Sequence, residues 1–238
     1  MPSATLLARL LQVLALCVGA HALAYEVVPV SGGGKIEGKV VFQGSVPTKK
    51  IIVTKDRDAC GATRDEPMML VGTDKGVQDV VVYLKEVTKG KAWGPPAKAP
   101  AIDNVKCRFE PTVQVIRAGP FDIVNSDPVL HNTHAYYGKR TAFNVALPNQ
   151  GQRIKKELER PGTVKVDCDS HGWMLAWVHV ADSPYYALTG KDGSFSITDV
   201  PPGEYTLVAT HDYTGDNTMP VTVKPNDAVK VPIELKKK

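Results

Sequence analysis

The sequence predicts an all-β protein. Short runs in which apolar and polar residues alternate recur along the chain, and Gly, Pro, Asn and Asp stand between them. No window longer than two helical turns repeats its apolar residues with a period of 3.6. Runs of this kind, separated by turn residues, are typical of β-sandwiches and β-barrels. The expected strands span residues 36–42, 50–54, 79–84, 112–116, 121–125, 143–147, 163–168, 175–180, 195–198, 205–210 and 229–235.

Residues 1–24 are expected to be a signal peptide. One Arg near the start, an apolar run and the small-x-small pattern of residues 22–24 support this. The apolar run is shorter than the roughly 20 residues that cross a bilayer, so a membrane anchor is disfavoured and no transmembrane segment is expected after cleavage. Cys17 lacks the small preceding residue of a lipoprotein signal. The mature chain is therefore expected to begin at Tyr25 and to be periplasmic or secreted.

Composition limits the function classes. Apolar residues make up 43% and charged residues 23% of the chain, so a core can be buried and wholesale disorder is excluded. The formal net charge is only +4, and basic residues are scattered apart from Lys236, Lys237 and Lys238 at the end. The sequence has no stripe of basic and aromatic residues of the kind that binds along a phosphate backbone, so no nucleic-acid partner is expected.

Two stretches without periodicity divide the mature chain. Residues 89–100 (KGKAWGPPAKAP) indicate a linker or a long loop. Residues 182–184 (Asp-Ser-Pro) separate the strand at 175–180 from a C-terminal part with its own turns. In that part, residues 191–194 (KDGS) and 200–203 (VPPG) bracket a strand, as hairpin turns do.

The C-terminal pattern DGSFSITDVPPGEYTLVAT resembles the carboxypeptidase regulatory-like sandwich, which has an immunoglobulin- and transthyretin-like fold. Near the N-terminus, GKIEGKVVFQGSVP and GVQDVVVYLK resemble its opening strand and an inner strand. This resemblance implies a discontinuous sandwich of residues 33–100 and 183–238, with a second domain of residues 101–182 inserted between its strands. The alternative is that residues 33–90 pack onto the middle domain as extra strands.

Three cysteines remain in the expected mature chain. An oxidising compartment lets two thiols form a disulfide, and an odd count leaves one cysteine for another task. Cys60 and Cys107 have no His or Met nearby in sequence, and we hypothesise that they pair. Cys168 has a different neighbourhood.

Four of the five mature histidines lie close to Cys168 and Met174 in sequence: His131, His134, His171 and His179. Residues 168–174 (CDSHGWM) form a C-x2-H-x2-M loop after an alternating strand, and His131 follows another strand upstream. One thiolate, two imidazoles and a weak axial thioether suit copper, because they favour neither Cu(I) nor Cu(II) strongly. The sequence therefore predicts a copper site.

The region from Val115 to Val180 resembles the cupredoxins, and among them most closely amicyanin and pseudoazurin, which have the same C-x2-H-x2-M spacing. The segments HNTH (131–134) and PGTVKVDCDSHGWM also follow the amicyanin pattern. The resemblance implies a Greek-key cupredoxin β-sandwich that holds one type 1 copper. The family's copper ligands correspond to His131, Cys168, His171 and Met174. The whole layout resembles the plastocyanin-like, methylamine-utilisation-type proteins of bacteria.

The resemblance also implies roles around the ligands. Asn132, which follows the first ligand, is expected to tie the two ligand segments together by hydrogen bonds. Ser170 stands where amicyanin has a proline, and its N–H, aimed at the Cys168 sulfur, would favour Cu(I) and raise the potential. Trp173 lies beside His171, the ligand usually nearest solvent in cupredoxins. It is either part of a docking patch for a redox partner or a buried aromatic plug.

Four of these residues also allow another role than the one the resemblance implies or than copper ligation. Cys168 and His171 could belong to a zinc site, but structural zinc sites usually show paired Cys or His motifs and do not use Met. His134 and His179 are expected to be structural, because a fifth ligand would crowd the trigonal plane and His179 alternates with Trp177 on a strand.

These observations favour a carrier of single electrons between periplasmic redox proteins, such as a dehydrogenase or a c-type cytochrome. A copper oxidase or nitrite-reducing enzyme would need histidines on both sides of Cys168, where Asp167 and Asp169 stand, so no enzyme is expected. The alternative is a secreted β-sandwich binding module in which copper is structural or delivered to another protein. The sequence leaves the oligomeric state and the identity of the partners open.

Overall fold

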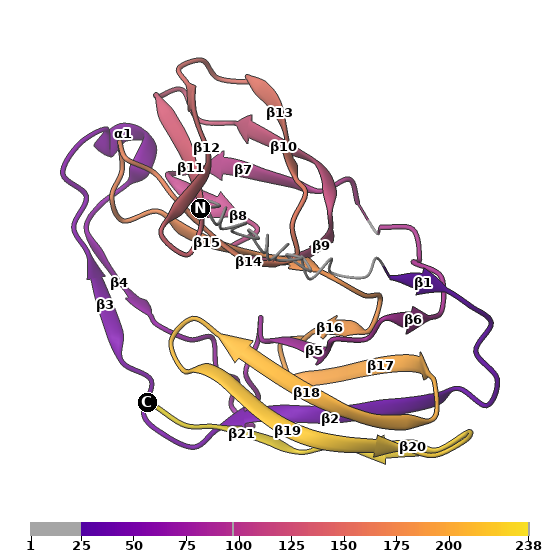
Figure 1. The fold of residues 1–238 in the computed structure, drawn as a ribbon. Coiled ribbons are helices and arrows are strands. Elements are labelled where there is room, and N and C mark those ends of the chain that lie inside the picture. The colour runs from indigo at the N-terminus through magenta and orange to yellow at the C-terminus, as the bar shows by residue number, and fades with distance from the viewer. Residues whose placement is uncertain (1–24, 97, 238) are drawn as a thin grey trace, which may run out of the picture.

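The computed structural model describes residues 25–96 and 98–237, so the predicted signal peptide lies outside the described residues. Nearly all regular structure is β, which confirms the predicted fold class. Within the described residues the only helix is the single turn α1 (Arg57–Cys60). None of the described helices is long and apolar enough to cross a membrane. Two lobes and a connecting arm make up the molecule (Figure 1).

The inserted lobe, residues 101–181, is a sandwich of two sheets. One sheet has the strand order β13-β10-β7-β8, and the other has the order β12-β11-β14-β15-β9. The strands are β7 (Ala101–Val105), β8 (Arg108–Glu110), β9 (Val113–Arg117), β10 (Gly119–Asn125), β11 (His131–Tyr137), β12 (Arg140–Leu147), β13 (Arg153–Leu158), β14 (Gly162–Asp167) and β15 (Leu175–Ala181). Alternate residues of both sheets point inward, so Phe121 and Ile123 from β10 pack with Val164 and Val166 from β14.

The flanking lobe is built from chain on both sides of the inserted lobe. Its sheets have the orders β16-β5-β18-β19 and β17-β2-β20, and β21 also pairs with β2. The strands are β2 (Gly34–Phe42), β5 (Val81–Lys85), β16 (Tyr186–Leu188), β17 (Ser194–Val200), β18 (Gly203–His211), β19 (Gly215–Val223), β20 (Ala228–Lys230) and β21 (Ile233–Leu235). Because β2 pairs with three C-terminal strands, early and late parts of the chain share one core.

The arm, residues 48–67, runs from the flanking lobe to the inserted lobe (Figure 1). Its strands β3 (Thr48–Ile51) and β4 (Arg64–Pro67) pair antiparallel, and α1 lies at its tip. Ile51, Val53 and Cys60 are buried in the core of the inserted lobe. The sequence analysis assigned residues 33–100 to the flanking sandwich, whereas the arm tip packs in the other core. Two further short strands, β1 (Glu26–Val27) and β6 (Lys89–Gly90), pair in parallel.

The predicted strands differ from the structure in several places. Among the longer strands, β7, β11, β13 and β19 were not predicted. The strand β11 was not predicted, because it begins with the polar residues His131, Asn132 and Thr133, all of which are buried. The predicted strand at 229–235 is divided into β20 and β21, and Pro232, which has no N–H to donate, lies between them.

His179 of β15 lies at the junction of the lobes. Its ring packs against Tyr83 of β5 with ring centroids 4.6 Å apart, and only 7% of the residue is exposed. Burial lowers the pKa of His179 to about 4, and the charge of Asp216 opposes the shift. The neutral ring is therefore the form that the folded protein accommodates, as the structural role predicted for it requires.

The stability of the protein is expected to fall as the pH drops from about 6.5 to about 4. In this pH window His179 takes up a proton in the unfolded chain but not in the folded protein. The free energy of unfolding therefore falls by about 3 kcal/mol in total. Urea unfolding of wild type and His179→Gln at pH 7, 5.5 and 4 measures this. The variant should lose less unfolding free energy on acidification, and equal losses in both proteins would contradict the assignment.

Candidate metal centre

Three potential ligand atoms meet in the core of the inserted lobe. His131 is the first residue of β11, Cys168 directly follows β14, and His171 lies in the loop before β15. The Nδ1 atoms of His131 and His171 are 3.0 Å apart, and the Cys168 sulfur lies 3.9 Å and 3.8 Å from them. All three residues are at most 1% exposed. Two strand ends and one short loop thus place one sulfur and two nitrogens around a single point.

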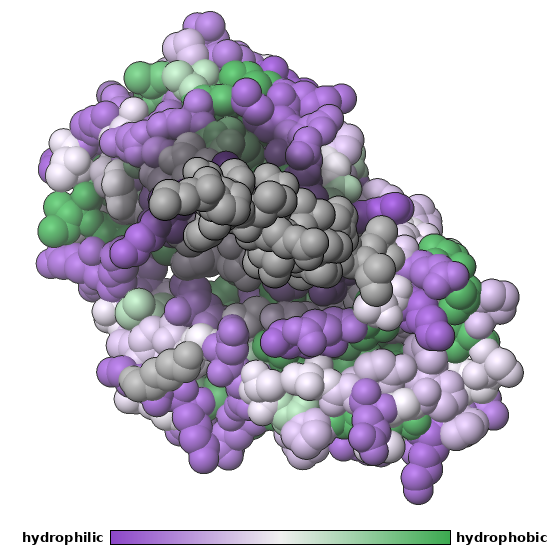
Figure 2. All heavy atoms as spheres, in the orientation of Figure 1, coloured by the Kyte–Doolittle hydropathy of each residue, from purple (hydrophilic) through white to green (hydrophobic). Residues whose placement is uncertain are grey.

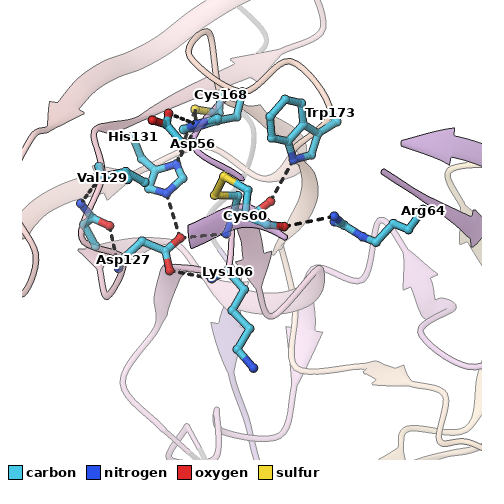
Figure 3. The surroundings of a disulfide bond; sticks show 12 residues. Asp56, Cys60, Arg64, Lys106, Asp127, Val129, His131, Cys168 and Trp173 are labelled. Carbon is cyan, nitrogen blue, oxygen red and sulfur yellow. Dashed lines mark hydrogen bonds and ion pairs between the residues drawn. A yellow bond between two sulfur atoms is a disulfide. The ribbon is translucent and has the colours of Figure 1, made fainter. Parts of the chain in front are cut away.

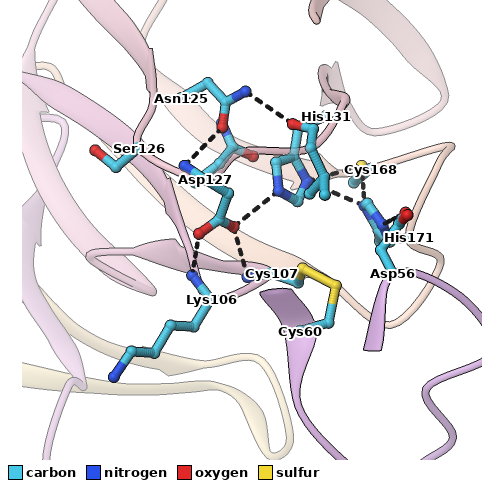
Figure 4. A network of polar contacts seen from close by, with 12 residues as sticks. Asp56, Cys60, Lys106, Cys107, Asn125, Ser126, Asp127, His131, Cys168 and His171 are labelled. Atoms are coloured by element: carbon cyan, nitrogen blue, oxygen red, sulfur yellow. Dashed lines mark hydrogen bonds and ion pairs between the residues drawn. A yellow bond between two sulfur atoms is a disulfide. The ribbon is translucent and has the colours of Figure 1, made fainter. Parts of the chain in front are cut away.

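Each imidazole is held from behind by a carboxylate (Figure 4). The Nε2 atom of His131 lies 2.9 Å from Asp127 Oδ2, and Nε2 of His171 lies 2.9 Å from Asp56 Oδ2. A carboxylate only accepts hydrogen bonds, so these contacts assign the ring proton to Nε2 in both residues. Burial lowers the pKa of His131, which keeps its ring neutral. In the neutral Nε2–H tautomer that these carboxylates favour, both Nδ1 lone pairs face the space between the rings.

This geometry fits a metal ion. When both rings are neutral Nε2–H tautomers, their Nδ1 lone pairs, 3.0 Å apart, can both bind one cation placed between them. A point equidistant from the three atoms lies about 2.1 Å from each, close to the usual metal–nitrogen and metal–sulfur bond lengths of about 2.0–2.3 Å. A carboxylate behind each ligating imidazole is the usual arrangement around bound metals in proteins. His131, Cys168 and His171 would therefore hold the ion.

Met174, the predicted axial ligand, is buried beside these residues. It is 2% exposed and belongs to the same cluster of core side chains as Cys168. Its backbone N–H donates to the carbonyl of His171 at 2.9 Å, which closes the loop into a turn. The loop thus folds so that both of its ends, Cys168 and Met174, are inside the lobe.

Asn132 joins the two ligand segments. Its Oδ1 accepts from the Ser170 N–H at 3.0 Å and lies 3.3 Å from the Cys168 sulfur, and its Nδ2 donates to Asp169. The Ser170 N–H, which was expected to face the Cys168 sulfur, bonds Asn132 and also acts on the thiol. Burial raises the pKa of the Cys168 thiol, and the backbone N–H groups of Asn132, His171 and Ser170 oppose that rise.

Cys60 of α1 and Cys107 of the β7–β8 turn form a disulfide beside the site (Figure 3). Among the described residues, Cys168 is the free cysteine. The Cys107 N–H donates to Asp127 Oδ2 at 2.8 Å, and the Lys106 N–H donates to Asp127 Oδ1 at 2.6 Å. Both Lys106 and Cys107 have positive φ angles, which turn their N–H groups toward the same carboxylate. The disulfide therefore connects the arm to the turn that holds Asp127.

Trp173 covers the outer side of the site. Its ring centroid lies 5.1 Å from that of His171, and its Nε1 donates to the Cys107 carbonyl at 3.2 Å (Figure 3). Trp173 and Met174 also line a cleft of about 410 Å³ between the arm and the two lobes. Figure 2 shows hydrophilic side chains over much of the outer surface of both lobes on this face. Trp173 thus packs on a ligand and keeps one side on the cleft.

His134 does not face the ligand triangle. Its ring stacks on Tyr136 and lies 2.9 Å from Thr141 Oγ1, and its Nδ1 lies 3.3 Å from Asp169. His134, Asp167 and Asp169 form a separate polar group at the surface of β11 and β14. The hydrogen bonds of the ring give His134 a structural role, as the sequence analysis expected.

Asp56 and Asp127 were missed by sequence reasoning. Asp127 carries a weak signal, because it precedes His131 by four residues and follows the strand that leads to it. Asp56 carries no signal, since it is 115 residues away from His171 in sequence.

No protein-family model and no curated protein matches the chain. Among solved structures, a purple cupredoxin from Nitrosopumilus maritimus is 24% identical, with a TM-score of 0.31 over 34% of this chain and 99% of that chain. Amicyanin from Paracoccus versutus is 21% identical, with a TM-score of 0.32 over 37% of this chain and 85% of that chain. A copper-containing nitrite reductase from Thermus scotoductus is 21% identical, with a TM-score of 0.31 over 38% of this chain and 24% of that chain. The carboxypeptidase regulatory-like resemblance stays a prediction.

The Cys60–Cys107 bond predicts a thiol count. A chain that begins at Tyr25, unfolded in denaturant without reductant, should show one reactive thiol, that of Cys168. The same chain after reduction should show three. Titration with a chromogenic disulfide reagent measures both values, and three thiols before reduction would contradict the pairing.

Proposed function

We propose that this chain binds one copper ion in the type 1 manner and carries single electrons between redox proteins in the periplasm or outside the cell. The observation that carries the proposal is the buried triangle of two imidazole Nδ1 atoms and one cysteine sulfur, with a carboxylate bonded to the far side of each ring. Copper there supplies one-electron chemistry, because one thiolate and two imidazoles suit both of its common oxidation states. Met174 is the proposed axial ligand.

The protein's own groups keep this donor set fixed. His131 begins β11 and Cys168 directly follows the neighbouring strand β14 of the same sheet, and Asn132 bonds across to Ser170. Burial of all three ligands excludes water, which would otherwise add ligands and require rearrangement at each change of charge. A rigid, dry donor set is the property that an electron carrier needs.

A role in catalysis has less support. Asp167 and Asp169 flank Cys168, and their carboxylates bond Lys165 and the amides of Asn132 and Asn144. No histidine on either side of the cysteine leads to a second metal. A non-enzymatic carrier therefore fits this arrangement better than a multicopper oxidase.

The partners are proposed to be a donor and an acceptor of single electrons, such as a dehydrogenase and a c-type cytochrome. Trp173 is the proposed docking residue, because it contacts the ring of His171 and lines the cleft between the lobes. An aromatic side chain on a metal ligand offers a partner both apolar contact area and a short path to the site.

Adding Cu(II) to the purified chain from Tyr25 onward should give an intense visible thiolate-to-copper charge-transfer band. Cys168→Ser should lose the band because the sulfur donor is gone. His134→Gln is the matched control: this histidine is near the site on β11 but bonds Thr141, so the variant should keep the band. A colourless wild-type protein under oxidising conditions would contradict the proposal.

The competing function is a secreted β-sandwich binding module in which copper is structural or delivered to another protein. Delivery predicts that the protein gives up its copper more readily than an electron carrier does. A carrier with this buried site should keep its copper through repeated oxidation and reduction in the presence of a chelator. A delivery protein should lose it within a few cycles. The measurement is the copper content after each cycle.

A further inference from the structure

The second nitrogen of His171 is not open to solvent. The residue is fully buried, and its Nε2 lies 2.9 Å from Asp56 of the arm. The Asp56 side chain is itself 37% exposed. The carboxylate therefore lies between a buried ligand and the surface, and it comes from a segment outside the inserted lobe.

Asp56 is held on both sides. The Cys60 and Ala59 N–H groups donate to its carbonyl at 2.8 Å and 3.0 Å, and Cys60 is bonded covalently to Cys107. Before it, Val53 is buried in the core of the inserted lobe, and Arg57 Nε reaches back to its carbonyl. Core packing on one side and the disulfide on the other thus fix where the carboxylate lies.

The backbone of Asp56 is also unusual. Its φ of 52° and ψ of 38° place it in the left-handed region, which few residues other than Gly, Asn and Asp adopt. It precedes α1 but makes no capping bond to that helix with its side chain. The side chain of a residue at this position usually caps the helix, whereas this one is turned to His171 instead.

We propose that Asp56 is a positioning residue for the metal ligand His171, and that the arm closes the site by carrying it there. The hydrogen bond keeps the proton on Nε2 and fixes the ring plane, so that Nδ1 always faces Cys168 and His131. It also prevents the ring from turning outward to release the ion. This inference rests on the proposed function for the identity of the metal.

The two carboxylates differ in origin. Asp127 lies in the inserted lobe, four residues before the ligand that it holds, and is 5% exposed. Asp56 is joined to its ligand only through the folded arm. Outer hydrogen-bond partners of metal ligands typically contribute about 10–100-fold to metal affinity. Docking of the arm and retention of the metal are therefore coupled.

The test compares three variants of the whole chain. Asp56→Gly removes the carboxylate and tolerates the left-handed backbone. Asp56→Asn keeps an acceptor of the same shape without the charge. Asp58→Asn is the matched control, because it removes the same charge two residues further along the arm, and among the described residues no hydrogen bond or ion pair joins the Asp58 side chain to the site.

Copper release to a Cu(I)-specific chelator should become about 10–100-fold faster in Asp56→Gly, with Asp56→Asn between it and wild type. Asp58→Asn should release copper at the wild-type rate. A double variant, Cys60→Ser with Cys107→Ser, keeps Asp56 but frees the arm and should also release copper faster. Equal rates in wild type and Asp56→Gly would overturn the inference.

A second readout does not need copper. In metal-free wild type and Asp58→Asn, the His171 Nε2 proton should give a sheltered downfield NMR resonance, because it is bonded to a carboxylate. In Asp56→Gly it should disappear through exchange with water. If copper gives no charge-transfer band but this resonance behaves as expected, the copper function fails and the positioning role stands; an unchanged resonance in Asp56→Gly overturns the positioning role.

Discussion

The protein holds two imidazole Nδ1 atoms, those of His131 and His171, 3.0 Å apart in its core. Each ring is bonded on its far side to a carboxylate, Asp127 or Asp56, and this favours the tautomer in which both Nδ1 lone pairs face the space between the rings. Much of the surrounding structure serves to keep those four groups in place. The β7–β8 turn presents two N–H groups to Asp127, and the arm carries Asp56.

The two sheets of the inserted lobe contribute the burial free energy that keeps these polar groups in a core. Side chains such as Phe121, Ile123 and Val166 are fully buried around them, each contributing about 1.5–3 kcal/mol. That burial offsets the cost of keeping polar rings and a thiol away from water. It also leaves the donors little freedom, because a packed sandwich core has few alternative arrangements.

The pattern of the sequence was informative where the contacts are local. The C-x2-H-x2-M loop brings Cys168 and His171 together as its spacing predicted, and Met174 is buried in the same lobe, while its role as axial ligand stays a prediction. The predicted strands follow from period-two alternation, and all were found with small shifts in their ends except the one at 229–235, which is divided into β20 and β21. The strand β11 breaks that rule, since it buries His131, Asn132 and Thr133 to build the site, and alternation cannot reveal buried polar residues.

Long-range contacts were beyond such reasoning. The contact of Asp56 with His171 joins residues 115 positions apart, and no sequence pattern around either residue indicates that they meet. The packing of Ile51 and Val53 in the inserted lobe could not be predicted from the sequence either, because an apolar strand fits the core of either lobe. The disulfide was inferred from the number of cysteines and their sequence context. Its role is visible only in the structure, where it joins the arm that carries Asp56 to the turn that bonds Asp127.

The arm has a consequence for anyone who wishes to move the metal centre elsewhere. A contiguous fragment of residues 101–182 contains all four proposed ligands, yet it omits Asp56 and Cys60. Such a fragment would keep an unpaired thiol at Cys107 and a bare apolar depression where Val53 packs. The metal centre is therefore not contained in one contiguous segment. Transferring it to another protein requires two segments of chain joined by a disulfide.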